Sequence, residues 1–124
     1  MPIVEIEIIT RPGEAINKDL SRQLADLVGE VFASPPGGTW VKLNQLPIEH
    51  YAENGGGLSP DVFPVFVSVI KSKIPGQIEL ENEIALLTSA IARACGRPKE
   101  NVHILYHANV AGRIAFGGKL LLDQ

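Results

Sequence analysis

Cysteine is nearly absent from this sequence, and long hydrophobic runs are absent altogether. The single cysteine among 124 residues, Cys95, excludes a disulfide framework and a cysteine-rich zinc site, which fits a reducing compartment. The longest apolar stretch, Val62 to Ile70, is far shorter than the roughly 18–20 residues of a membrane span. Glu5 and Glu7 interrupt the apolar amino-terminal segment, which excludes a secretory signal peptide. We therefore expect a cytoplasmic protein with no membrane partner.

An excess of charge of one sign is also lacking. The 11 basic and 14 acidic side chains give a formal net charge of −3, and the basic residues form no block. Binding to nucleic acid requires a basic patch, so no nucleic-acid partner is expected. His103 and His107 lie four residues apart in a strand-like segment, which separates them by about 13 Å and prevents them from sharing a metal ion. No metal or other cofactor is expected.

The first half of the chain has the pattern of a β-α-β unit. Residues 3–9 alternate between apolar and acidic side chains, which predicts a strand. Apolar residues then recur at helical spacing from Leu20 to Phe32, which predicts a helix of about sixteen residues with Asn17 as its N-cap. Two prolines and two glycines at 35–38 end the helix, and residues 39–46 have the β-branched and aromatic character of a second strand.

The second half repeats this order of elements. After three glycines at 55–57, a third strand is predicted at Val65–Ile70 and a fourth at Asn101–Tyr106. The helix between them ends at Gly96. Its predicted buried face consists of Leu80, Ile84, Leu87, Ile91 and Ala94.

The two halves align with each other at an offset of about 62 residues. Pro2 matches Pro64 and Arg11 matches Lys73 at an offset of 62, and Lys42 matches His103 at 61. Matches that keep the same order along the chain favour an internal duplication. We therefore interpret residues 1–124 as one domain that contains two pseudo-repeats, at approximately 2–57 and 64–120.

The predicted fold is of the α/β (α+β) class. Each β-α-β unit places a helix across two parallel strands, so two units side by side give a four-stranded sheet with two helices on one face. Phe66, Ser68, Ile70 and Ile104 would supply strand surface that two helices cannot cover entirely. Burial of this surface against further copies of the chain predicts a homo-oligomer.

Four features carry a family resemblance. Met1-Pro2 runs directly into a strand, Arg11 stands at the end of that strand, and Val41-Lys42 lies in the second strand. The fourth feature is the closing segment at 110–120, Val-Ala-Gly-Arg-Ile-Ala-Phe-Gly-Gly-Lys-Leu. In these features the sequence resembles the tautomerase superfamily, which includes 4-oxalocrotonate tautomerase, macrophage migration inhibitory factor and malonate semialdehyde decarboxylase. The resemblance covers nearly the whole chain and implies a β-α-β tautomerase fold with two units per chain that forms a homotrimer.

The resemblance also implies an enzyme with an amino-terminal proline. Removal of Met1 would make Pro2 a free secondary amine, the catalytic base for isomerising a small keto-enol or unsaturated keto acid. An amine acts as a base only when it is unprotonated, and burial beside cations lowers its pKa. Arg11 and Lys42 would supply these cations, bind the substrate carboxylate and stabilise the enolate. If Met1 stays attached, Pro2 is acylated and this mechanism fails.

Further binding residues follow from the same resemblance. A cation at the end of the third strand, Lys73 or its neighbour Lys71, would bind the substrate carboxylate. His103, the match of Lys42, would donate a hydrogen bond or merely pack. Ile114 takes the place of the aromatic wall of single-unit relatives.

Several activities stay open at this point. Isomerisation requires the fewest assumptions, because the spacing reveals neither an aspartate for decarboxylation nor a complete water-activating set. The alternatives are a decarboxylase, hydratase or dehalogenase on the same scaffold, or a non-catalytic trimeric binding protein. Only one catalytic amine per chain is available, because Pro64 is internal and its nitrogen belongs to an amide.

Overall fold

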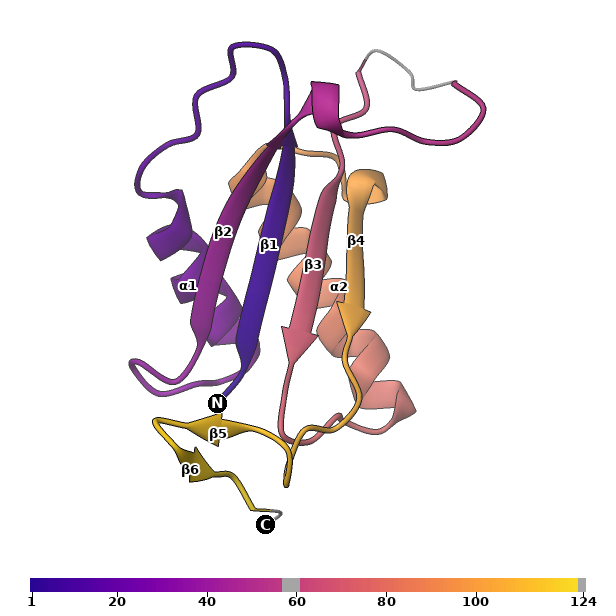
Figure 1. The fold of residues 1–124 in the computed structure, drawn as a ribbon. Coiled ribbons are helices and arrows are strands. Elements are labelled where there is room, and N and C mark those ends of the chain that lie inside the picture. Colours follow the sequence, from indigo (N-terminus) through magenta and orange to yellow (C-terminus); the bar gives the residue numbers. More distant parts are fainter. Residues whose placement is uncertain (57–60, 123–124) are drawn as a thin grey trace.

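Four strands form one mixed sheet in the computed structural model, which describes residues 1–56 and 61–122 (Figure 1). The sheet order is β2-β1-β3-β4, with β1 parallel to β2, β3 parallel to β4, and the two pairs joined by antiparallel pairing of β1 with β3. The predicted four-stranded sheet is therefore confirmed. The strands are β1 (Ile3–Thr10), β2 (Trp40–Pro47), β3 (Val65–Ile70) and β4 (Val102–Tyr106).

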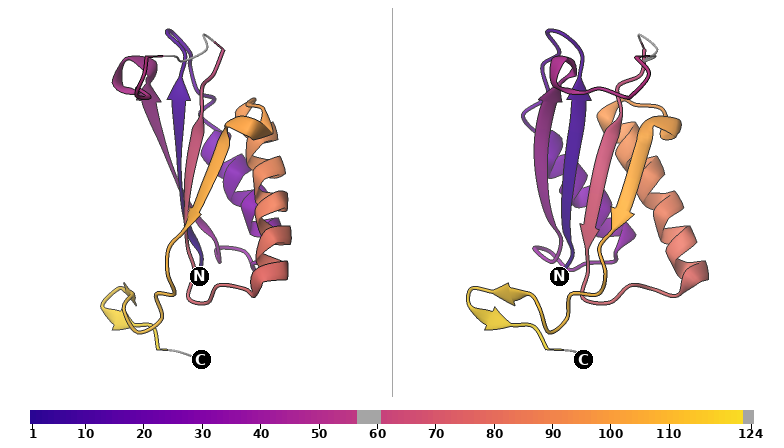
Figure 2. Two further views of the ribbon diagram at one scale, coloured as in Figure 1. Left: turned by 90° about the vertical axis from the view of Figure 1, so that its right-hand side faces the viewer. Right: turned by 45° about the vertical axis from the view of Figure 1, so that its right-hand side comes forward.

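Two helices cover one face of this sheet, as predicted (Figure 2). They are α1 (Leu20–Val31) and α2 (Gln77–Cys95), and Gly96 ends α2 in the left-handed conformation with φ 66°. No helix in the described part of the chain is long and apolar enough to cross a membrane. Short 3-10 helices follow β2 and α2, at η1 (Ile48–His50) and η2 (Lys99–Asn101).

The first helix is shorter than predicted. It has 12 residues, and Asp19 rather than Asn17 is its N-cap. The side-chain oxygen of Asn17 accepts a hydrogen bond from the Asp19 N–H at 2.9 Å, and the backbone carbonyl of Asn17 accepts one from the Leu20 N–H at 3.0 Å. Asn17 therefore forms a local turn before the helix, a conformation that asparagine side chains stabilise as readily as a cap.

The closing segment forms a small hairpin beyond the sheet. Strands β5 (Ala115–Phe116) and β6 (Lys119–Leu120) are antiparallel. Gly117 and Gly118 connect them with φ of 58° and 85°, values that glycine adopts without strain. The hairpin lies near the amino terminus and projects away from the helices (Figures 1 and 2).

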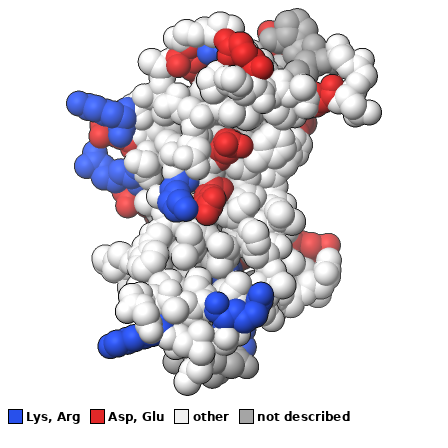
Figure 3. All heavy atoms as spheres, viewed as in Figure 1, with Lys and Arg blue, Asp and Glu red and all other residues white. Residues whose placement is uncertain are grey.

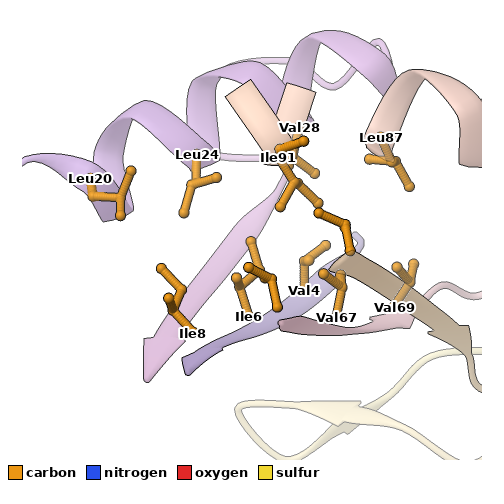
Figure 4. Packing of buried hydrophobic residues seen from close by; sticks show 13 residues of the cluster. Val4, Ile6, Ile8, Leu20, Leu24, Val28, Val67, Val69, Leu87 and Ile91 are labelled. Atoms are coloured by element: carbon orange, nitrogen blue, oxygen red, sulfur yellow. The ribbon is translucent and has the colours of Figure 1, made fainter. Parts of the chain in front are cut away.

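The core lies between the sheet and the two helices (Figure 4). Alternate residues of β1 and β3 face the helices, and the pairing places Ile6 opposite Val67 at the centre. These side chains are almost fully buried, so most of the apolar area that stabilises the fold belongs to this layer. The principal members are Val4, Ile6, Ile8, Leu20, Leu24, Val28, Val65, Val67, Val69, Leu87 and Ile91.

The face of the sheet away from the helices is only partly as predicted. Phe66 is exposed on it, but Ile104 packs against the core, contrary to the prediction. Ile104 pairs with Val67, and laterally paired residues share one face of a sheet, so Leu105 lies on the open face instead and is 62 % exposed. Side chains of both charge signs also occupy this side of the molecule (Figure 3).

Strand register shows how the two units correspond. Ile3 pairs with Trp40 and Val65 with Val102, so the separation along the chain is the same in both units. Val4 and Val65 both face the helices, so only an odd offset between the halves keeps each side chain on its face. The offset of 61 that matches Lys42 with His103 meets this condition. The offset of 62 matches residues that flank the strands, such as Pro2 with Pro64. Within the strands it would match residues that lie on opposite faces of the sheet.

The glycines between the units are described only in part. Gly55 and Gly56 have φ of 90° and 69°, and Gly57 lies outside the described residues.

Candidate active site

A pocket of about 400 Å³ lies at the amino-terminal end of β1. Pro2 and Lys71 both line it. Ile3 pairs with Ile70 in antiparallel register, so Pro2, which precedes Ile3, lies beside Lys71, which follows Ile70. The rest of the described lining consists of Met1, Phe32 at the end of α1, the loop at 33–38 and Ser72. The register thus brings Pro2 into one pocket with a lysine from the other half of the chain.

Lys71 is held in place on two sides. Its Nζ donates a hydrogen bond to Glu83 Oε1 at 3.1 Å and lies 4.6 Å from the centroid of the Phe32 ring. The Lys71 and Glu83 side chains are only 18 % and 13 % exposed, so solvent screens this ion pair less than a surface pair. Lys71 therefore presents an ordered positive charge to the pocket.

Tyr106 completes this network from β4. Its hydroxyl donates to Glu83 Oε2 at 2.5 Å. Burial and the adjacent Glu83 carboxylate raise the pKa of Tyr106 well above its usual value, so the phenol stays protonated at neutral pH. Both Glu83 oxygens thus have a partner, one from Lys71 directly after β3 and one from Tyr106 in β4.

Trp40 connects three segments around Pro2. Its backbone N–H donates to the Pro2 carbonyl at 3.0 Å, and its indole Nε1 donates to the Gly37 carbonyl at 3.0 Å. The Trp40 ring also meets the Phe116 ring edge-on, with centroids 5.4 Å apart. β2, the pocket loop and the hairpin are therefore tied together at the amino terminus.

The pocket loop begins with a strained residue. Ala33 has φ 53°, and the Ser34 N–H bonds to the Gly29 carbonyl while the Ala33 N–H bonds to that of Glu30. This is the Schellman motif, in which glycine is the usual residue at the position of Ala33. The alanine side chain therefore costs stability at this point of the wall.

Substitution Ala33→Gly is expected to raise the free energy of unfolding by about 0.5–1 kcal/mol, because it relieves the left-handed alanine at a modest cost in chain entropy. Urea denaturation measures this change. The control Ala25→Gly, in the middle of α1, should lower the same quantity by about 1 kcal/mol. A loss of stability in Ala33→Gly would contradict the assignment of strain.

Comparison with known proteins was made by sequence and by structure. No protein-family model and no curated protein sequence matches the chain. Macrophage migration inhibitory factor from Trichinella spiralis superposes with a TM-score of 0.73 at 16 % identity, covering 96 % of this chain and 99 % of the other. A fused 4-OT wild type symmetric trimer gives 0.72 at 15 %, covering 96 % and 94 %. The chain has the tautomerase-superfamily fold.

A third tautomerase-fold structure is that of Pt0534 inactivated by 2-oxo-3-pentynoate. It gives a TM-score of 0.71 at 20 % identity and covers 96 % of this chain and 94 % of the other. The predicted fold is thus confirmed over nearly the whole chain.

Arg11 lies at the other end of β1 from Pro2 within this tautomerase fold. The eight residues of β1 separate the two, which places them about 30 Å apart along the extended chain. Arg11 lies 4.6 Å from the Phe63 ring centroid and 3.4 Å from Glu14. Within one chain Arg11 is therefore not brought to the Pro2 pocket.

Lys42 and His103 lie on the open face of the sheet. Lys42 Nζ donates to Glu5 Oε1 at 3.2 Å, and the His103 ring lies 5.6 Å from that of Phe66. His103 lines a separate depression of about 250 Å³ together with Leu105. Neither residue is among the described residues that line the Pro2 pocket.

Lys73 and Ile114 also lie outside the lining of the Pro2 pocket. Lys73 is exposed and follows Lys71 by two residues, while Ile114 directly precedes β5 of the hairpin. Of the two lysines at the end of β3, the structure therefore places Lys71 beside Pro2. The described residues contain no group of three or more acidic, histidine or cysteine side chains arranged to hold a metal ion.

Arg97 is a buried cation at the opposite end of the sheet that the sequence analysis missed. Its side chain is 2 % exposed and forms an ion pair with Glu14 at 2.9 Å. It also donates to the carbonyls of Phe63, Ile9 and Cys95. The guanidinium therefore joins the end of β1 to the segment before β3 and to the end of α2.

The ion pair predicts a dependence of stability on acid. The hydrogen bond from Arg97 holds the pKa of Glu14 below its usual 4.5, so its contribution is complete at neutral pH and is lost as pH falls through the lowered pKa. The difference in unfolding free energy between wild type and Glu14→Gln should therefore be largest above about pH 5.5 and shrink towards pH 3. Urea denaturation at several pH values measures it. A difference independent of pH would contradict the lowered pKa.

Proposed function

We propose that this protein is a tautomerase, an isomerase that acts on a small keto-enol or unsaturated keto acid with Pro2 as its amino-terminal base. The observation that carries this proposal is the placement of Pro2 and Lys71 in one pocket. An amine that removes a proton and a cation that binds the carboxylate are the two groups that this reaction requires. The tautomerase-superfamily fold supports the proposal.

The first requirement of the mechanism is the loss of Met1, which acylates the Pro2 nitrogen in the sequence. The freed secondary amine would stand in a partly apolar pocket beside the Lys71 ammonium. Both conditions favour the uncharged amine, because a second positive charge is unfavourable there. Pro2 would then have the free electron pair that a general base needs.

The reaction can be written with two proton transfers. A ketone substrate loses a proton from the carbon next to its carbonyl to the Pro2 nitrogen, and the electrons of the broken C–H bond form an enolate. Lys71 would hold the substrate carboxylate throughout the reaction. The Pro2 ammonium then returns the proton to the enolate oxygen, or to a different carbon in an unsaturated acid.

The proposed assembly is a homotrimer. The fused 4-OT neighbour is a symmetric trimer, and Phe66 and Leu105 leave apolar surface on the open face of this sheet. Binding of the substrate by Arg11, Lys42, Lys73, His103 and Ile114 stays a prediction. Arg11 and His103 would reach the Pro2 pocket only from a neighbouring copy.

Mass spectrometry tests the proposal before any variant is made. The intact mass should show loss of Met1, and the protein should ketonise phenylenolpyruvate. Because the reagent 2-oxo-3-pentynoate inactivates the neighbour Pt0534, it should also add to this protein and increase the mass of its amino-terminal peptide. A retained Met1 in active protein, or labelling that avoids the amino terminus, would refute Pro2 as the base. Absence of turnover across a panel of keto-enol, halo-acrylate and semialdehyde substrates would instead favour a binding protein.

A further inference from the structure

The Lys71 ammonium group has three N–H donors, and two of its sides contact other side chains. One donor is directed at Glu83 Oε1, and another side of the group faces the Phe32 ring. Lys71 is the one charged side chain among the described residues of the pocket lining. The remaining side of the ammonium group is thus available to a ligand.

Glu83 and Tyr106 lie behind Lys71 as seen from the pocket. Neither belongs to the described lining, so neither would touch a substrate. Glu83 is nevertheless 13 % exposed and accepts hydrogen bonds at both oxygens, one from Lys71 and one from Tyr106. A carboxylate fixed at both oxygens fixes the cation that it binds.

We propose that Glu83 and Tyr106 are positioning residues that hold the Lys71 ammonium in the Pro2 pocket, with one N–H left to bind a substrate carboxylate. The assignment rests on the proposed function for its catalytic meaning.

Two conservative variants test this role. Glu83→Gln keeps the shape of the side chain and removes its charge, and Tyr106→Phe removes only the hydroxyl that orients Glu83. We expect KM for phenylenolpyruvate to rise about tenfold in Glu83→Gln and about threefold in Tyr106→Phe, with kcat changed by less than about threefold in both. A fall in kcat at unchanged KM would overturn the positioning role.

Matched controls come from similar pairs elsewhere in the chain. Glu81→Gln removes the same charge from the same helix, where Glu81 accepts a hydrogen bond from Gln77 on the surface. Tyr51→Phe removes a hydroxyl that donates to Glu53 at 2.6 Å. Both controls should leave KM within about twofold of wild type. An equal rise of KM in the controls would overturn the assignment.

A double-mutant comparison shows whether Glu83 acts through Lys71. In a Lys71→Met background, Glu83→Gln should raise KM no further, because the group that it positions is gone. A further rise of severalfold would mean that Glu83 influences the site by another route and would overturn the proposal.

Chemical labelling of Lys71 separates this inference from the proposed function. Acetic anhydride acylates lysine amines that it can reach, and the hydrogen bond to Glu83 Oε1 holds the Lys71 Nζ in one position. Loss of the Glu83 charge weakens this hydrogen bond and releases the amine to the reagent. Acylation of Lys71 at pH 8, measured by peptide mass spectrometry, should increase about threefold or more in Glu83→Gln. Unchanged acylation would overturn the positioning role even in an active enzyme. An enzyme without turnover that still shows the increase would refute the tautomerase proposal alone.

Discussion

Pro2→Ala is expected to lower kcat/KM for the ketonisation of phenylenolpyruvate by at least about a hundredfold, the usual contribution of a positioned general base. Alanine retains a free α-amino group after removal of Met1, but this primary amine is not held by a ring against the pocket wall. The variant therefore loses the position of the nitrogen as well as its secondary amine character. Steady-state kinetics with the purified variant measure the loss.

The matched control is Pro64→Ala. Pro64 precedes β3 as Pro2 precedes β1, but it is fully buried and its nitrogen is part of an amide. Its replacement should leave kcat/KM within about threefold of wild type, provided that the variant is folded by circular dichroism. Equal rates in wild type and Pro2→Ala would remove the amine from the mechanism.

Arg97→Met is expected to lower the free energy of unfolding by about 3 kcal/mol, the lower end of the range for breaking a buried ion pair. Methionine fills a similar volume but leaves three backbone carbonyls without the hydrogen bonds that the guanidinium donates. The effect is smaller than for a fully buried pair, because the Glu14 side chain is 20 % exposed and regains water. Urea denaturation at fixed protein concentration measures it.

Arg93→Ala is the control for this substitution. Arg93 is exposed in the last turn of α2, the helix that precedes Arg97, where loss of an arginine should change stability by no more than about 0.5 kcal/mol. A loss below about 1 kcal/mol in Arg97→Met would show that the buried ion pair contributes little beyond what a hydrophobic side chain supplies.

Periodicity predicted the elements of the fold well because their faces differ strongly in polarity. β3 was predicted at its observed bounds, and β1, β2 and β4 to within one residue at each end. The assignment of Ile104 to the open face was wrong, because Ile104, Leu105 and Tyr106 are consecutive apolar or aromatic residues and His103 alone marks a polar face in β4. Asn17 was misplaced because an asparagine before a helix stabilises a turn as well as a cap.

The site itself was only partly predictable. The position of Pro2 follows from its place before a strand, but the choice between Lys71 and Lys73 requires the antiparallel register of β1 with β3. No sequence spacing indicates that Glu83 and Tyr106 meet behind Lys71, because they lie 23 residues apart in different elements. Arg97 was missed for the same reason, since its partners lie far along the chain.

Because β1 pairs with β3 in antiparallel register, the residues that line the Pro2 pocket come from both halves of the chain. The first half supplies Pro2, Phe32 and the pocket loop, and the second supplies Lys71 together with Glu83 and Tyr106. A gene split between β2 and β3 would therefore produce two fragments of which neither has a complete site. Co-expression of the fragments would restore the site only if they recreate the central strand pair, so recovery of activity would report on that pairing. In the proposed mechanism, the pairing of β1 with β3 therefore serves both the fold and the reaction.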